Sequence, residues 1–174
     1  MPETLAASLL SEIIKRQNIQ SQNLNTVILA NAFGTGGNMA RYAALAANFD
    51  NQIDAFTIDA QCSGGLKSVE IANAYITSGL AGGIIAGGLE SKSLAPIKKY
   101  QEQDQRNDGK AYNIANFYPN QISKTPMLDA AKNVALKHGI SKNEMMDWTA
   151  KSHQKAMASN FGDFIFKTSE NQFD

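Results

Sequence analysis

The chain has 174 residues, enough for a domain with a hydrophobic core, and 43% of them are hydrophobic, which is ordinary for a globular protein. The formal net charge is zero and charged residues make up 18%, which excludes a broad basic surface for nucleic acid. The single cysteine excludes an intrachain disulfide and fits a reducing compartment. The sequence has no secretory signal and no apolar run of the ~20 residues that cross a bilayer, so we expect a cytoplasmic protein without a membrane segment.

The first elements alternate between helix and strand. Apolar residues at helical spacing predict an amphipathic helix over residues 4–16, and a β-branched apolar run predicts a buried strand over residues 26–30. A glycine-rich loop over residues 31–38 then leads into an alanine-rich helix over residues 39–47. The loop could be a phosphate cradle, but it lacks both the GxGxxG spacing and a Walker lysine, so we favour a turn with close backbone approach.

The next stretch repeats this order. Residues 55–59 predict a strand, Cys62 follows it in a sharp turn, and a helix then runs to about Gly79. Residues 82–86 predict the third strand. Strands separated by helices indicate an α/β sheet with parallel pairs.

The helix after Cys62 has Leu66, Val69, Ala72, Asn73 and Ile76 along one side. Small residues, Ser68, Ala72 and Ala74, are frequent in it, so we expect it to pack closely against its neighbours.

Cys62 itself allows two interpretations. A thiol at a helix N-terminus lies near unpaired N–H groups and the positive end of the helix dipole, which favour the nucleophilic thiolate. The alternative is a small buried apolar residue, the usual role of a lone cysteine.

The second half of the chain has a different character. From about residue 94 it is charged, polar and aromatic without clear periodicity, which indicates a long surface excursion from the sheet. Helical patterns return over residues 128–137, closed by Gly139, and over residues 142–160, which begin with the capping-box residues Ser141 and Glu144.

The second half of the chain also contains a candidate strand and both histidines. Residues 164–166 could begin a strand. His138 and His153 lie on the two predicted helices, and we expect both at the surface.

Several separated segments together resemble the N-terminal half of a thiolase, an acetyl-CoA acetyltransferase or 3-ketoacyl-CoA thiolase. GNMAR is similar to the family's G-Q/G-N-x-A-R, TIDAQCSGGL to T-V-N-x-x-C-x-S-G-L, and AGGLESKS to A-G-G-x-E-x-M-S. Further matches fall on the family's loop-domain helices. The matching segments are residues 37–41, 57–66, 86–93, 133–135, 139–141 and 152–156.

The resemblance implies an α/β fold: a mixed, mostly parallel sheet with helices, followed by a helical loop domain. Residues 1–93 would form a partial α/β core and residues 94–174 a truncated loop domain. The first strand and the C-terminal half of the family's fold would be lacking.

The resemblance also implies acyl transfer from acyl-CoA, such as acetyl-CoA, in fatty acid metabolism. Cys62 would be the acyl-accepting nucleophile, with its backbone N–H in the oxyanion hole, and Met127 would contact the substrate. No metal or prosthetic group is expected, since the CoA thioester is the substrate. The partners would be acyl-CoA and either further copies, in a dimer or tetramer, or a chain that supplies the missing half.

The departures from the family pattern limit these expectations. Asp59 stands where the family has Asn, and Pro126 stands where it has a substrate-contacting His. The family's activating histidine and second cysteine lie in its C-terminal half, so we expect no turnover by this chain alone. Further interpretations stay open: a non-catalytic CoA-binding or assembly module or half of a split enzyme, and a ketosynthase-like condensing protein.

Overall fold

The computed structural model describes residues 1–34, 36–112, 116–120 and 125–166. The chain divides into two compact units: Met1–Ile114 with Phe166–Asp174, and Ala115–Ile165. The predicted domain boundary between residues 93 and 94 stays a prediction.

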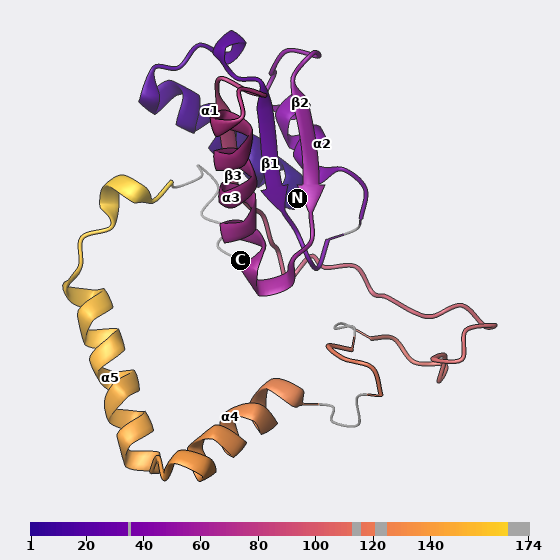
Figure 1. Cartoon of the computed structure of the whole chain (residues 1–174), viewed down its shortest axis with the longest axis vertical. Helices are drawn as coiled ribbons and strands as arrows, with labels where there is room; N and C mark the ends of the chain where they lie inside the picture. The colour runs from indigo at the N-terminus through magenta and orange to yellow at the C-terminus, as the bar shows by residue number, and fades with distance from the viewer. Residues whose placement is uncertain (35, 113–115, 121–124, 167–174) are drawn as a thin grey trace. The chain divides into compact units, whose positions relative to one another are not determined.

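A three-stranded parallel sheet forms the centre of the first unit. β1 (Thr26–Ala30) lies between β2 (Asp54–Ile58) and β3 (Ile84–Gly88), as Figure 1 shows. Ala30, at the end of β1, pairs with Ile58 and with Gly88, so the carboxyl ends of the three strands finish level. All five residues of β1 are buried, which explains its continuous apolar sequence.

The first two strands agree with the prediction to within one residue, but the third begins two residues later than predicted. The Asn25 side-chain oxygen accepts the backbone N–H groups of Gly82 and Gly83, at 2.7 and 3.0 Å. These glycines are thereby held in the turn before β3, although their neighbours Ile84 and Ile85 suggested a strand around them.

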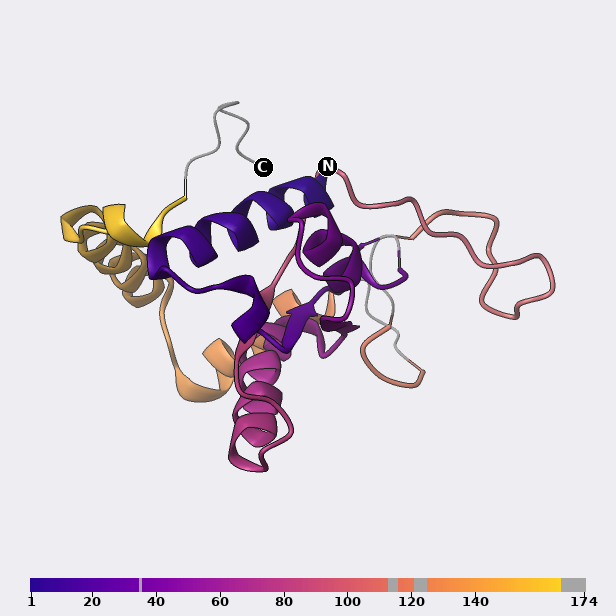
Figure 2. The same cartoon turned by 90° about the horizontal axis from the view of Figure 1, so that it is seen from above.

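Helices cover both faces of the sheet. α1 (Pro2–Gln17) and α2 (Met39–Ala46) pack on one face, and α3 (Gly64–Thr77) packs against β1 and β3 on the other (Figures 1 and 2). The main hydrophobic core lies on the first face. It comprises Ala6, Leu10, Leu24, Val27, Leu29, Met39, Ala40, Ala43, Ala44, Phe49, Ile53, Ala55 and Leu89.

The buried side of α3 is made of small residues. Gly64, Ser68 and Ala72 face the sheet, whereas Leu66 is 76% exposed and Val69 and Ile76 about half exposed. A Cβ added at Gly64 would lie 2.7 Å from the Cβ of Ala30, which leaves no room for larger side chains there. The expectation of close packing through small residues is therefore confirmed, and the more apolar side of the helix is the exposed one.

The GNMAR motif ties α2 to the segment before β2. The Asn38 side chain caps α2 by accepting the Arg41 backbone N–H at 3.0 Å, and its amide donates to the Ala55 carbonyl at 2.7 Å. The Arg41 guanidinium donates to the carbonyls of Asn51 and Ile53. The motif thus fixes a loop and a helix start, which is a structural role.

The segment after β3 has no helix or longer strand among residues 94–112. An isolated antiparallel bridge joins Lys98 to Tyr112, and the Tyr100 and Tyr112 rings stack 4.4 Å apart. The Arg106 guanidinium lies 4.3 Å from the centre of the Tyr100 ring. The excursion predicted from residue 94 is therefore confirmed in this part, and it is closed on itself by these contacts.

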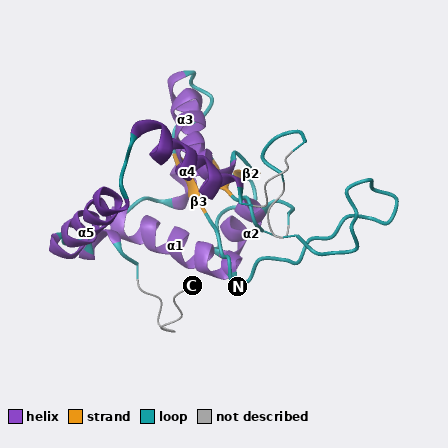
Figure 3. Ribbon diagram, turned by 90° about the horizontal axis from the view of Figure 1, so that it is seen from below, coloured by secondary structure: helices purple, strands orange, loops and turns teal. Residues whose placement is uncertain are grey.

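The second unit contains two helices, α4 (Pro126–His138) and α5 (Lys142–Ala158), which Figure 3 draws in purple. Gly139, with a φ of 65°, ends α4 in the left-handed conformation that glycine adopts without strain. Ser141 and Glu144 form the predicted capping box at the start of α5. None of the described residues in these two helices is buried.

The strand suggested for residues 164–166 is wrong. Phe164 ends a 3₁₀ turn, Gly162–Phe164, and the two described residues after it belong to no strand. The side chain of Asn160 accepts the backbone N–H of Gly162 at 3.0 Å and so favours a turn at this point.

Candidate active site

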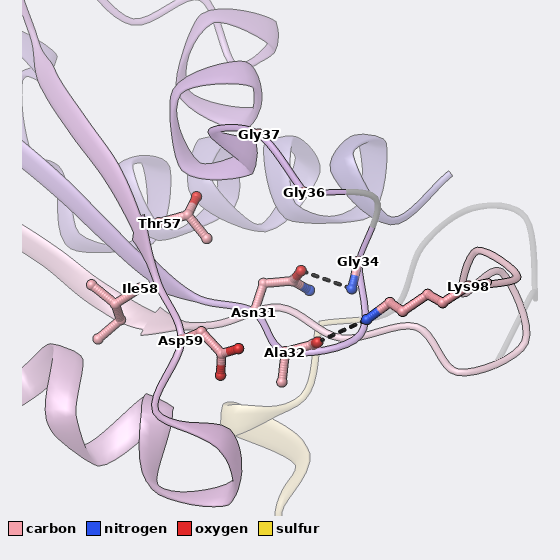
Figure 4. A pocket seen from close by; sticks show the side chains of 9 residues that line it. All are labelled: Asn31, Ala32, Gly34, Gly36, Gly37, Thr57, Ile58, Asp59 and Lys98. Carbon is pink, nitrogen blue, oxygen red and sulfur yellow. Dashed lines mark hydrogen bonds between the residues drawn. The ribbon is translucent and has the colours of Figure 1, made fainter. Parts of the chain in front are cut away.

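The carboxyl ends of β1 and β2 frame a crevice. The chain leaves β1 toward α2 on one face of the sheet and leaves β2 toward α3 on the other, which makes this a topological switch point. A cavity of about 390 Å³ lies here (Figure 4). Its lining residues are Asn31, Ala32, Gly34, Gly36, Gly37, Thr57, Ile58, Asp59 and Lys98. Crevices of this kind are where open α/β sheets bind ligands.

Glu90 holds the loop that forms one wall of the crevice. Its carboxylate accepts the backbone N–H groups of Ala32, at 2.9 Å, and Phe33, at 3.1 and 3.2 Å. It also accepts the Asn31 side-chain amide at 3.1 Å, and that amide donates to the Leu89 carbonyl at 2.7 Å. The end of β3 thereby fixes the chain that leaves β1.

The glycines of this loop serve different needs. A Cβ at Gly34 would collide with the Asn31 side chain, whose oxygen accepts the Gly34 N–H at 2.9 Å. Gly36 and Gly37 have φ angles of 82° and 77°, and no atom lies within 4 Å of an added Cβ. The predicted turn is therefore confirmed, with close approach at Gly34 and left-handed backbone at the next two glycines.

Lys98 brings a positive charge to the crevice. Its Nζ donates to the Ala32 carbonyl at 3.5 Å, the contact that Figure 4 marks with a dashed line. Among the ion pairs of the described residues, none includes Lys98. Asp59, on the β2 side, supplies a carboxylate to the same cavity.

Cys62 lies next to this crevice along the chain, in a 3₁₀ turn, Gln61–Ser63, directly before α3. Its side chain is exposed, so it is no buried apolar residue. The predicted place of the thiol, at the start of a helix, is confirmed. Its role as a nucleophile stays a prediction.

Close backbone packing fixes the helix start behind the thiol. The Cβ of Ala30 fills the space where Gly64 would carry a side chain, and the Cα of Gly65 lies 3.9 Å from the Cβ position of Gly88. The Ser68 hydroxyl lies within hydrogen-bond distance of two carbonyl oxygens, that of Gly65 at 2.7 Å and that of Gly87 at 3.0 Å. The first turn of α3 is thus seated on the ends of β1 and β3.

The other candidate residues belong to the second unit. Met127 lies in the first turn of α4 and is 65% exposed, and its substrate contact stays a prediction. Pro126 begins α4, a position where its missing N–H removes no helical hydrogen bond. His138 and His153 are exposed on α4 and α5, as expected.

Sequence reasoning found Cys62 and missed Asn31, Glu90 and Lys98. Asn31 directly follows β1, and Glu90 lies two residues after the end of β3. Polar residues at the carboxyl ends of parallel strands are a signal that could have identified both. Lys98 lies ten residues after β3, in a segment without periodicity, and had no such signal.

Two kinds of feature are absent from the described part of the chain. No group of three or more His, Cys, Asp or Glu side chains is placed to hold a metal ion in this part of the chain. Within the same residues, no helix is both long and apolar enough to span a membrane.

Known proteins match this chain over most of its length. The family described as thiolase, N-terminal domain, matches residues 1–167. A Staphylococcus epidermidis protein, provisionally named acetyl-CoA C-acetyltransferase VraB, is 38% identical over 157 residues, which are 89% of this chain and 41% of the relative. Its namesake from Staphylococcus aureus strain MRSA252 is 36% identical over 155 residues, with 88% and 41% covered.

A solved structure agrees with these sequence matches. The crystal structure of the Bacillus anthracis acetyl-CoA acetyltransferase superposes with a TM-score of 0.81 at 27% identity, over 97% of this chain and 46% of that one. This chain therefore spans less than half the length of the relatives it matches. The predicted α/β fold, a partial thiolase N-terminal half, is confirmed. The chain belongs to the thiolase family.

Proposed function

We propose that this chain is the acyl-accepting part of an acyl-CoA thiolase-type acyltransferase, with Cys62 as the nucleophile. The observation that carries the proposal is the exposed thiol at the start of α3, three residues along the chain from Asp59, which lines the crevice at the ends of β1 and β2. Family membership and the acetyltransferase names of the relatives support acetyl-CoA or another acyl-CoA as the substrate.

The chemistry is a thioester exchange. The Cys62 sulfur attacks the thioester carbonyl carbon, the bond between that carbon and the CoA sulfur breaks, and the acyl group stays on Cys62. The proton lost by the thiol ends on the departing CoA thiolate, so no oxidant or metal is needed. The backbone N–H of Cys62 would stabilise the tetrahedral oxyanion, at the helix end whose dipole favours negative charge.

The remaining catalytic groups would come from outside these 174 residues. The thiolate is the attacking form of a cysteine, so efficient turnover needs a base that takes the thiol proton. His138 and His153 lie on exposed helices of the second unit. We infer that a further polypeptide segment supplies the base and the second thiol for carbon–carbon bond formation or cleavage.

The remaining expectations join this proposal. Residues 1–93 would be the α/β core and residues 94–174 the loop domain that covers CoA, with Met127 lining the acyl pocket. The enzyme would work in the cytoplasm, in fatty acid metabolism, as a dimer or tetramer. The CoA thioester would be substrate, with no resident cofactor.

A test uses the purified chain and acetyl-CoA. We expect intact-mass spectrometry to show one added acetyl group, none on the Cys62→Ser variant, and no 3-ketoacyl-CoA product. Acylation by acyl carrier protein but not by CoA would instead favour a ketosynthase-like protein. Steady thiolysis by the chain alone would contradict the missing base.

A second candidate is half of a split enzyme that acts only with a separate partner chain. The exposed apolar side of α3, with Leu66, Val69 and Ile76, favours it because another surface would have to cover these side chains. Affinity purification from the native cell should then recover a partner with a G-H-P histidine and a second reactive cysteine. A native protein of twice the mass would instead place both halves on one chain.

A further inference from the structure

The residue directly before Cys62 has an unusual backbone conformation. Gln61 has a φ of 51°, in the left-handed region that side chains other than glycine rarely adopt. It is a residue of the 3₁₀ turn that carries the thiol, so its conformation sets the direction in which Cys62 leaves the sheet. Such strain persists only where neighbouring groups hold it.

Asp59 provides a group that holds Gln61. Its Oδ1 accepts the Gln61 backbone N–H at 2.9 Å, a local turn that aspartate and asparagine side chains both form. A second turn spans the thiol: the Ala60 carbonyl accepts the Ser63 hydroxyl at 2.8 Å and the Ser63 backbone N–H at 3.2 Å. Cys62 thus lies within a hydrogen-bonded turn that overlaps the one held by Asp59.

The base of this arrangement is the sheet itself. Asp59 directly follows β2, whose last residue, Ile58, accepts the Asn31 backbone N–H at 2.9 Å. A side chain anchored at the end of a paired strand has a fixed position, so the hydrogen bond to Gln61 transmits that position to the thiol.

We propose that Asp59 is a positioning residue, which holds Gln61 in the left-handed conformation and so directs the Cys62 thiol toward an acyl donor. The inference rests on the proposed acyl transfer to Cys62. It assigns the effect to the acceptor atom of Asp59, since asparagine offers the same oxygen without the charge.

Four variants of the full chain test this. Asp59→Ala removes the acceptor, Asp59→Asn keeps it, and Gln61→Gly removes the need for it, because glycine adopts positive φ freely. The double variant Asp59→Ala with Gln61→Gly tests whether a glycine at position 61 restores the acetyl-transfer rate that is lost with the hydrogen bond. The chain has one cysteine, so every thiol measurement reports Cys62.

The readout is the rate of acetyl transfer from acetyl-CoA, divided by the rate of alkylation by iodoacetamide. Thioester attack needs a defined approach, so misplacement lowers this ratio, whereas a change in thiolate fraction alters both rates. We expect about a tenfold fall for Asp59→Ala, a change within about twofold for Asp59→Asn and Gln61→Gly, and recovery of most of the loss in the double variant.

Three results would overturn the inference: an unchanged ratio in Asp59→Ala, a loss in Asp59→Asn as large as in Asp59→Ala, or no recovery in the double variant. If the unaltered chain accepts no acetyl group, the proposed function fails instead. The positioning is then decided by the NMR backbone shifts of Gln61, which report its φ. They should move in Asp59→Ala and stay in Asp59→Asn, and unchanged shifts in Asp59→Ala would refute it.

Discussion

Two neighbouring glycines at the start of α3 differ in the space around them. An added Cβ at Gly64 would lie 2.7 Å from the Cβ of Ala30, in the central strand, whereas nothing lies within 4 Å of one at Gly65. Both have backbone angles that alanine adopts, so the comparison isolates packing.

We therefore expect Gly64→Ala to lower the free energy of unfolding by about 1–3 kcal/mol, because β1 or α3 has to shift. Gly65→Ala should be neutral or raise it by up to about 1 kcal/mol, since alanine is the better helix former. Urea unfolding measures both. Equal stability of the two variants would show that α3 is not seated on Ala30.

An exposed ion pair makes the stability of the segment after β3 depend on pH. The Arg106 side chain donates to Asp104 from Nε, at 2.9 Å, and Nη2, at 2.6 Å, and lowers the pKa of Asp104 from 3.8 to about 2. A depressed folded pKa means that the stabilising contribution is complete above the ordinary value and is lost as the pH falls through about 2.

Acid titration should therefore loosen the Tyr100–Tyr112 stack, which Arg106 covers, between about pH 4 and pH 2. NMR signals of the two tyrosine rings follow this change, and Asp104→Asn should remove that step of the titration. A ring titration unaffected by Asp104→Asn would assign the change to another group.

At this scale the sequence was informative about Cys62 and poor about its surroundings. Cys62 is the single thiol and follows a strand, which made it visible. Glu90 and Asp59 act through contacts with chain segments or turns that periodicity does not report: Glu90 binds the backbone nearly sixty residues earlier in sequence. The Glu90 contacts form only once the strands are paired, whereas the Asp59 contact lies in a local turn.

Among the elements, α5 has the clearest local determinant. The Ser141 side chain accepts the Glu144 backbone N–H at 3.2 Å, and the Ser141 backbone N–H donates to the Glu144 carboxylate at 2.7 Å, which lowers the pKa of Glu144. No described residue of α5 is buried, so we expect the stability of this helix to depend on local interactions such as the cap.

Ser141→Ala should lower the stability of α5 by about 1 kcal/mol, seen as lower helical circular dichroism and earlier thermal loss of helix signal. Ser152→Ala, the same substitution in the middle of α5, is the matched control and should leave the signal unchanged or slightly higher. Equal losses in both variants would exclude the capping box as the cause.

The two sides of α3 predict opposite responses to mutation. Leu66 is 76% exposed and Ala72 is 7% exposed. Leu66→Ala should change the free energy of unfolding of this chain by less than about 0.5 kcal/mol, while Ala72→Leu should lower it by about 1–3 kcal/mol through overpacking against the sheet.

The Leu66→Ala variant also shows whether another surface covers α3. A large loss on Leu66→Ala in the isolated chain, measured by chemical unfolding, would show that the apolar side of α3 is already covered, for example by a second copy. That result would contradict the exposed face on which the split-enzyme candidate rests.

Elements with strong local sequence signals were predicted well. The errors in the prediction come from tertiary contacts. The strand at residues 26–30 and the two C-terminal helices were visible from β-branched residues, a C-terminal glycine and a capping box. The third strand begins two residues after its predicted start, because the Asn25 side chain, fifty-seven residues earlier in the sequence, binds the glycines before it. The apolar pattern of α3 pointed away from its buried side, because glycine and serine fit against Ala30 and Gly87 where larger residues do not.

For the whole molecule, we propose that an N-terminal thiolase half carries the acyl-accepting thiol. The relatives are more than twice as long, so this chain would supply the nucleophile and a wall of the crevice while a further segment supplies the base. This division explains an exposed Cys62, an uncovered α3 and two helices without buried residues in one account.

Peptide mapping after incubation with acetyl-CoA shows which residue accepts the acyl group. We expect the acetyl group on the peptide that contains Cys62, released by neutral hydroxylamine as a thioester is, and absent from Cys62→Ser. Acetylation confined to lysine side chains, or an equal acetyl content in Cys62→Ser, would contradict the assignment of Cys62 as the acyl acceptor.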